Sequence, residues 1–181
     1  MEVENLFTLK EVDDEEDEKL TYLEINLSWG TQQEINFLDN FRLECYNKKY
    51  DMIIKKLKEK KYRGYDRLDF IIVKLNDAYD IIKSYVELKS RKYDKPIDLY
   101  ISISKIDYVK KHKLKNVFIV WNNTIKNIYY YVLLTDELIE KLLNLKPFEL
   151  RGQPTIIVDK NDVRTSNRVK NVVKYIHKNI K

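Results

Sequence analysis

Apolar positions in the first third of the chain follow two different periods. Residues 20–27 alternate between apolar and polar, which predicts a strand or an extended lead-in. A break follows around Gly30. Thr31 and Glu34 then have the spacing of a capping box, with Thr31 as N-cap and Glu34 at the third helical position, which predicts that a helix begins there. A second helical stripe over residues 47–61, with lysines opposite, is either a continuation of that helix or a separate one.

From Leu68 onward the pattern changes to strands. Residues 68–73 are β-branched and aromatic, Asn76-Asp77 is a turn, and residues 79–90 form a second strand, so the pair predicts an antiparallel hairpin. Beyond it we expect helices over 105–113, from Thr135 or Asp136 to about 145, and from 166 onward, and strands over 117–121, 125–134 and 155–158. This order predicts a single mixed α/β domain over residues 21–181, with a sheet built from hairpins and flanked by helices.

Composition removes several classes of function. The chain has 181 residues, enough for one domain with a real core. Its three glycines are far apart in the sequence, which excludes a Rossmann glycine fingerprint and a phosphate-binding P-loop. Cys45 is the single cysteine, so the sequence offers neither an internal disulfide framework nor a cysteine-built zinc site. No apolar run approaches the ~18 residues of a membrane span, and we expect a soluble cytoplasmic protein without a membrane partner.

Charge is distributed unevenly along the chain. The net charge is +5, but residues 1–18 hold nine acidic side chains and one basic side chain, so that segment carries −8 and the rest carries +13. We expect residues 1–20 to form a disordered acidic tail, or an arm that folds over a basic groove and competes with nucleic acid. The basic remainder favours a polyanionic partner, most often nucleic acid. The alternative is a solvated lysine-rich surface, because the abundance of lysine, asparagine, isoleucine and tyrosine also fits an A+T-rich coding genome.

One group of residues carries a possible chemistry. Residues two apart on a strand project to the same face, so Glu87 and Lys89 project together, and the hairpin lets Asp69 approach Glu87. Two carboxylates and an exposed backbone carbonyl suit Mg²⁺, and Lys89 would orient a water or stabilise negative charge on a phosphate. The alternative is a surface ion pair between neighbouring charges.

These residues resemble a known superfamily. Residues 65–70 (Y-D-R-L-D-F) and 86–91 (V-E-L-K-S-R), with the S-K segment inside 103–107, are similar to the PD-(D/E)XK nucleases, more narrowly to small phage and large-virus proteins. The resemblance covers about residues 31–134, and Leu68 replaces the usual proline. It implies a restriction-endonuclease-like core and Mg²⁺-dependent hydrolysis of DNA phosphodiesters in viral or phage replication, recombination or DNA processing.

The resemblance also implies roles for single residues. Asp69 and Glu87 would be metal ligands beside the carbonyl of Leu88, and Lys89 would be the catalytic lysine. Glu34 stands where many members supply another carboxylate, but a capping residue at that place needs no metal, and both roles stay open.

Further residues have a less direct connection to the motif. Asp66 is a rival of Asp69 as the first ligand. Arg67, Arg91 and Lys105 would contact phosphates or support the ligands from behind, with surface salt bridges as the alternative. The pattern of the basic C-terminal helix favours an ordinary amphipathic helix with a lysine-rich solvent face over one that tracks a phosphate backbone.

Three functions from different classes therefore remain. The first is a metal-dependent nuclease, endo- or exonucleolytic, that hydrolyses phosphodiesters in nucleic acid, with DNA favoured over RNA and a homodimer as one possible assembly. The second is a nucleic-acid-binding protein that keeps the fold without cleaving. The third is a protein-interaction module that uses the acidic tail.

Overall fold

The computed structural model describes residues 22–57, 68–75 and 81–180. The helices are α1 (Tyr22–Lys48), α2 (Ile103–Lys111), α3 (Asp136–Leu143) and α4 (Val169–Asn179). The strands are β1 (Met52–Lys56), β2 (Phe70–Leu75), β3 (Ile81–Arg91), β4 (Tyr100–Ser102), β5 (Val117–Asn123), β6 (Ile128–Leu133), β7 (Phe148–Leu150), β8 (Gln153–Ile157) and β9 (Arg164–Ser166). The expected acidic tail, the turn at Asn76-Asp77, and the candidates Asp66 and Arg67 lie outside the described residues.

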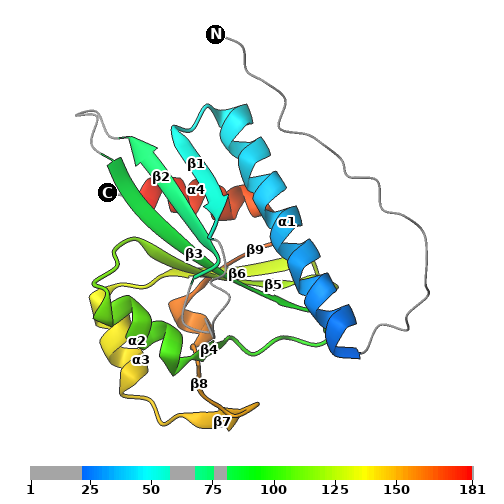
Figure 1. Cartoon of the computed structure of the whole chain (residues 1–181), viewed down its shortest axis with the longest axis vertical. Helices are drawn as coiled ribbons and strands as arrows, with labels where there is room; N and C mark the ends of the chain where they lie inside the picture. The colour runs from blue at the N-terminus through cyan, green and yellow to red at the C-terminus, as the bar shows by residue number, and fades with distance from the viewer. Residues whose placement is uncertain (1–21, 58–67, 76–80, 181) are drawn as a thin grey trace.

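The strands form a large mixed sheet and a small antiparallel one (Figure 1). The large sheet has the order β1-β2-β3-β5-β6-β9, and the small one has the order β4-β8-β7. Neighbours in the large sheet are antiparallel except β3 and β5, which run parallel. A parallel pair needs a crossover connection, and here β4 and α2 lie in it. The mixed α/β fold with a hairpin-built sheet flanked by helices is confirmed.

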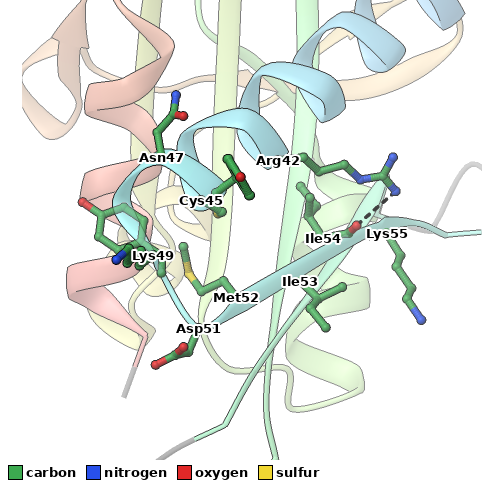
Figure 2. A pocket seen from close by; sticks show the side chains of 11 residues that line it. Arg42, Cys45, Asn47, Lys49, Asp51, Met52, Ile53, Ile54 and Lys55 are labelled. Atoms are coloured by element: carbon green, nitrogen blue, oxygen red, sulfur yellow. Dashed lines mark hydrogen bonds between the residues drawn. The ribbon is translucent and has the colours of Figure 1, made fainter.

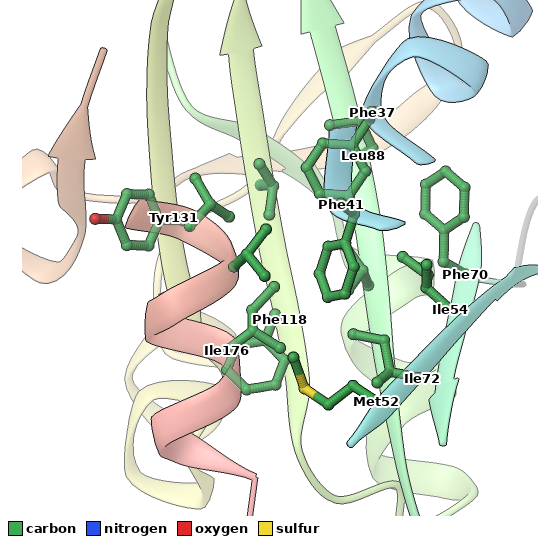
Figure 3. Packing of buried hydrophobic residues seen from close by; sticks show 14 of the residues in the cluster. Phe37, Phe41, Met52, Ile54, Phe70, Ile72, Leu88, Phe118, Tyr131 and Ile176 are labelled. Carbon is green, nitrogen blue, oxygen red and sulfur yellow. The ribbon is translucent and has the colours of Figure 1, made fainter. Parts of the chain in front are cut away.

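Helices α1 and α4 cover one face of the large sheet (Figure 1). Phe37 and Phe41 of α1 are buried there, and the ring centroids of Phe37 and Phe70 are 5.7 Å apart. Leu88 of β3 and Ile176 of α4 belong to the same cluster (Figure 3). Burial of each such side chain contributes about 1.5–3 kcal/mol, so this layer fixes the central strand that carries the candidate motif.

Helices α2 and α3 and the small sheet cover the opposite face. Ile119 and Trp121 of β5 are buried against Ile106 of α2 and Leu142 of α3. The indole Nε1 of Trp121 donates a 2.9 Å hydrogen bond to the carbonyl of Tyr100. This bond ties the small sheet to the large one on the face that carries Glu87 and Lys89.

Two expectations for the N-terminal third are wrong. Residues 22–27 are helical rather than extended, because α1 runs without a break through Gly30. Thr31 therefore lies inside the helix, and the capping box does not exist. The buried stripe of Phe37, Phe41 and Cys45 holds one long helix on the sheet, which outweighs the weak helical preference of a single glycine.

The helix expected over residues 47–61 is also wrong in its described part beyond the end of α1, residues 49–57. Met52–Lys56 is the edge strand β1, in which Met52 and Ile54 are buried while Ile53 is exposed. A short apolar run fits either period in the sequence, and pairing with β2 decides between them.

Later elements agree more closely with expectation. The hairpin of β2 and β3, the strands β5 and β6, and the helices α2 to α4 stand near the predicted places. Helix α2 begins at Ile103, two residues earlier than expected, and α3 is capped by Thr135, whose Oγ1 accepts a hydrogen bond from the N–H of Leu138. No helix among the described residues is long and apolar enough to cross a membrane.

Candidate active site

Asp69 and Glu87 lie close together at one end of the β2–β3 pair, where the charge of Glu87 raises the pKa of Asp69. The antiparallel register ends at the pair of Phe70 and Val86, and the N–H of Asp69 also donates a 3.1 Å hydrogen bond to the carbonyl of Val86. Asp69 therefore lies just outside the regular ladder, as the extra residue of a bulge. Glu87 lies on the face covered by α2 and the small sheet, where it accepts a hydrogen bond from Lys105 of α2.

Glu87 is 3% exposed and is held by two lysines. Its Oε1 accepts a 3.0 Å hydrogen bond from Lys89 Nζ, and its Oε2 accepts one of the same length from Lys105 Nζ. A buried carboxylate is costly unless it is paired, and the two lysines provide that pairing for Glu87. Lys105 comes from α2, and the β3–α2–β5 crossover is what brings it to the strand.

Asp69 is held by the backbone of the neighbouring strand. Its Oδ2 accepts a 2.7 Å hydrogen bond from the N–H of Leu88. The pKa of Asp69 is raised to about 7, chiefly by burial and next by the charge of Glu87, against the lowering effects of the Leu88 hydrogen bond and of Lys105. In a strand the N–H and C=O of one residue point to the same side, so the Leu88 carbonyl also points toward Asp69.

Glu34 approaches this pair from α1. It forms an ion pair with Lys56 of β1, and its charge is one of those that raise the pKa of Asp69. Because Glu34 lies inside α1, it has no capping role. Its carboxylate lies near Asp69 and is paired with Lys56.

Of the three residues expected to contact phosphates, two are described. Lys105 is 9% exposed and bound to Glu87, which matches a supporting position rather than a surface contact. Arg91 lies with Lys89 in a pocket of about 250 Å³. The same pocket includes Arg151, which sequence reasoning missed. The available signal was the dipeptide Arg151-Gly152, which occupies the two-residue turn between β7 and β8.

A broader hollow of about 740 Å³ lies elsewhere, between the end of α1 and β1 (Figure 2). It is lined by Cys45, Tyr50 and Met52 among others, and Arg42 crosses it to donate a hydrogen bond to the carbonyl of Ile54. It contains none of the acids or lysines of the candidate site.

Within the described part of the chain, no three acidic, histidine or cysteine side chains are grouped so as to hold a metal ion by themselves. The candidate site instead offers two carboxylates. Mg²⁺ commonly takes one or two protein carboxylates and completes its shell with waters and substrate phosphates. The donor set of Asp69, Glu87 and the Leu88 carbonyl fits that type of site.

Comparison with solved structures gives the fold. A nuclease from a fusselovirus superposes with a TM-score of 0.51 at 13% identity, over 91% of this chain and 100% of that one. The Holliday junction resolvase Hjc of Archaeoglobus fulgidus aligns with a TM-score of 0.39 at 10% identity, over 68% of this chain and 87% of that one, too low to carry an argument. No family model and no curated protein matches the sequence. The chain has a restriction-endonuclease-like fold, as the resemblance to PD-(D/E)XK nucleases implied.

Proposed function

We propose that this protein is a metal-dependent nuclease that hydrolyses phosphodiester bonds in DNA. The observation that carries the proposal is the closeness of the two acids: the N–H of Leu88, next to Glu87 in the chain, donates to Asp69, the Glu87 charge acts on Asp69, and Lys89 is bound to Glu87. The fold shared with a viral nuclease supports the same class of activity and a role in processing viral DNA.

In this proposal Asp69, Glu87 and the Leu88 carbonyl hold one Mg²⁺ or Mn²⁺. Each carboxylate oxygen has more than one lone pair, so Glu87 accepts from both lysines and still has capacity for a metal. The raised pKa of Asp69 reflects two acids held close together in a buried place, a cost that a divalent cation offsets. When bound, the metal supplies a Lewis acid and lowers the pKa of a coordinated water.

The residues of the chain perform the remaining steps. Lys89 stands between Glu87 and the pocket, where its ammonium is placed to orient the attacking water or to stabilise charge that develops on the phosphate. Lys105 neutralises Glu87 from the other side and is a positioning residue. The Leu88 N–H fixes the orientation of Asp69.

The net charge of +13 on residues 19–181 supports a nucleic-acid partner, and the resemblance to DNA nucleases makes DNA the preferred one in this proposal. A homodimer that cuts both strands stays a prediction, and its test is the molar mass in solution with and without DNA.

The test is a cleavage assay on linear, circular and single-stranded DNA and on RNA, with Mg²⁺, Mn²⁺ or EDTA. We expect metal-dependent cleavage of DNA that falls roughly 100-fold or more in Glu87→Gln and Lys89→Met. Lys115→Ala is the matched control, because it removes a lysine from an exposed ion pair with Asp136. Cleavage retained in both site variants would overturn the assignment.

The non-cleaving DNA-binding protein is the second candidate, because the same basic surface serves it. Binding without cleavage, unchanged in Glu87→Gln and Lys89→Met, would favour it. Loss of a protein partner on deletion of residues 1–18, with no nucleic-acid binding in the intact chain, would favour the interaction module instead.

A further inference from the structure

The pocket beside Lys89 lies where the two sheets meet. Lys89 and Arg91 enter it from β3, Tyr100 and Ser102 from β4, and Arg151 from the turn between β7 and β8. Three of its side chains are cationic, and none of the described residues that line it is acidic. Two acids outside the pocket are hydrogen-bonded to its lining: Glu87 accepts a 3.0 Å bond from Lys89, and Oδ2 of Asp98 accepts a 2.9 Å bond from the hydroxyl of Tyr100.

The two arginines are held together although they repel. Burial lowers the pKa of the Arg91 guanidinium, Tyr93 and Tyr100 act in the opposite direction, and the charge of Arg151 lowers it. Arg91 donates from Nη1 to the carbonyl of Ser90 at 2.8 Å, and that bond leaves its positive charge uncompensated. Two like charges on a pocket wall are stabilised by an anion between them.

The turn that presents Arg151 has a demanding backbone. Arg151 has φ +52° and Gly152 has φ +75°, and Leu150 pairs with Gln153 across them. Positive φ at both central residues is typical of a type I′ turn, in which asparagine is preferred at the first position. Arginine is less favourable than asparagine at this turn position, but it places a guanidinium in the pocket.

The position of the pocket relative to the cleavage site follows from strand geometry. Glu87, Lys89 and Arg91 project to one face of β3, with successive residues of this series about 6.6 Å apart (two steps of roughly 3.3 Å). A strand of nucleic acid whose reacting phosphate lies at Lys89 therefore continues over Arg91. Arginine's planar guanidinium binds phosphate oxygens in pairs, and hydroxyl and amide groups on the wall supply further polar contacts.

We propose that this pocket binds a phosphate of the substrate strand adjacent to the cleaved bond, with Arg91 and Arg151 as its charged ligands. The inference rests on the proposed function, because it takes the strand cut at Lys89 as the occupant. The phosphate is either internal to the strand or at its end, and the chemistry of recognition is the same for both.

The experiment measures DNA binding by the full chain in EDTA, where metal-dependent cleavage does not occur, as a function of salt concentration. We expect Arg151→Asn to reduce the slope of log K against log salt by about 0.7–0.9, the effect of one lost phosphate contact. Arg151→Lys should retain most of that slope. Lys174→Ala is the control, because it removes one exposed charge from α4 on the opposite face of the sheet.

Arg151→Asn keeps the turn, so its melting temperature should equal or exceed that of the unaltered chain. A slope equal to that of the unaltered chain, or a loss no larger than for Lys174→Ala, would overturn the proposal. Two kinds of DNA distinguish an internal phosphate from a terminal one. They are a closed circular duplex, which has no ends, and linear duplexes with and without terminal phosphates. A slope change on the circle identifies an internal phosphate, and a change confined to phosphorylated ends identifies a terminal one.

Combined with the cleavage assay in Mg²⁺, this binding measurement separates the pocket proposal from the nuclease assignment. If the chain binds DNA through Arg151 but never cleaves it, the pocket stands and the catalytic role fails. If the chain cleaves DNA and Arg151→Asn changes neither the salt slope nor KM, the pocket proposal fails alone.

Discussion

The backbone N–H of Leu88 donates a 2.7 Å hydrogen bond to Oδ2 of Asp69. The strand that carries Glu87 therefore also orients the acid on the neighbouring strand. The bond stabilises the charged form of Asp69, whereas burial and the Glu87 charge oppose it more strongly, and the pKa is raised to about 7. Near neutral pH Asp69 is therefore about half protonated in the absence of metal.

This raised pKa predicts how stability depends on pH without metal. The folded chain keeps a proton on Asp69 between about pH 4 and 7, where the unfolded chain has lost it. The free energy of unfolding should therefore fall as pH rises through that window, by up to about 1.4 kcal/mol per pH unit from this group. Urea unfolding in EDTA at several pH values measures the slope.

Asp69→Asn is the test of that assignment. The variant has no carboxyl to titrate, so its stability should fall less steeply than that of the unaltered chain over the same window. An unchanged pH dependence in Asp69→Asn would show that the proton resides on another group.

The two lysines on Glu87 should differ in what they support. Lys105→Met removes a buried partner and should lower the free energy of unfolding by about 1–3 kcal/mol. Lys89→Met removes the partner whose side chain is more exposed, so it should cost less stability and more activity. Urea unfolding compares the stabilities of the two variants, and initial cleavage rates, measured well below their melting temperatures, compare their activities.

A double-mutant cycle with Glu87→Gln identifies the cause of any loss. A coupling of about 0.5–3 kcal/mol between Lys105 and Glu87 is expected for contacting charged groups. Additive effects of the two substitutions would mean that Lys105 acts through its other contacts.

The sequence predicted the centre of the fold better than its beginning. The β2–β3 hairpin was readable because β-branched runs on both sides of a turn have few alternatives. The faces of Glu87 and Lys89 followed from the two-residue period of the strand. Lys105 was singled out, but its bond to Glu87 depends on the crossover through α2, which brings together residues 18 apart in the sequence.

The N-terminal errors have a common physical cause. Thr31 and Glu34 match a capping box and Gly30 matches a break, but these signals contribute about 1 kcal/mol each, less than the packing of one long apolar stripe. Arg151 lay beyond the motif, and only the small sheet brings it to Lys89.

Gly30 provides a direct test of the continuous helix. A Cβ at this position meets nothing within 4 Å, and the residue lies inside α1. Gly30→Ala should therefore raise the free energy of unfolding by about 0.5–1 kcal/mol, measured by urea unfolding. Gly152→Ala is the matched control and should destabilise, because its φ of +75° is unfavourable for alanine. A loss of stability in Gly30→Ala would restore the predicted helix start at Thr31.

Glu34 has lost its expected role as a capping residue, and its contacts bear on its other expected role as a metal ligand. It lies near Asp69 but pairs with Lys56, which places it beside the proposed metal ligands rather than among them. Glu34→Gln should weaken Mg²⁺ affinity roughly 10-fold, the effect of losing a group that supports a ligand, while stability changes by less than about 1 kcal/mol. The rise in melting temperature with Mg²⁺ concentration measures this affinity.

Asp69→Asn sets the scale for that experiment, because it removes a proposed ligand. If Glu34→Gln abolishes the Mg²⁺-dependent rise as completely as Asp69→Asn, then Glu34 must turn from Lys56 to the metal when the ion binds. A partial loss keeps Glu34 with Lys56, where its charge still acts on Asp69 and favours the binding of a cation there.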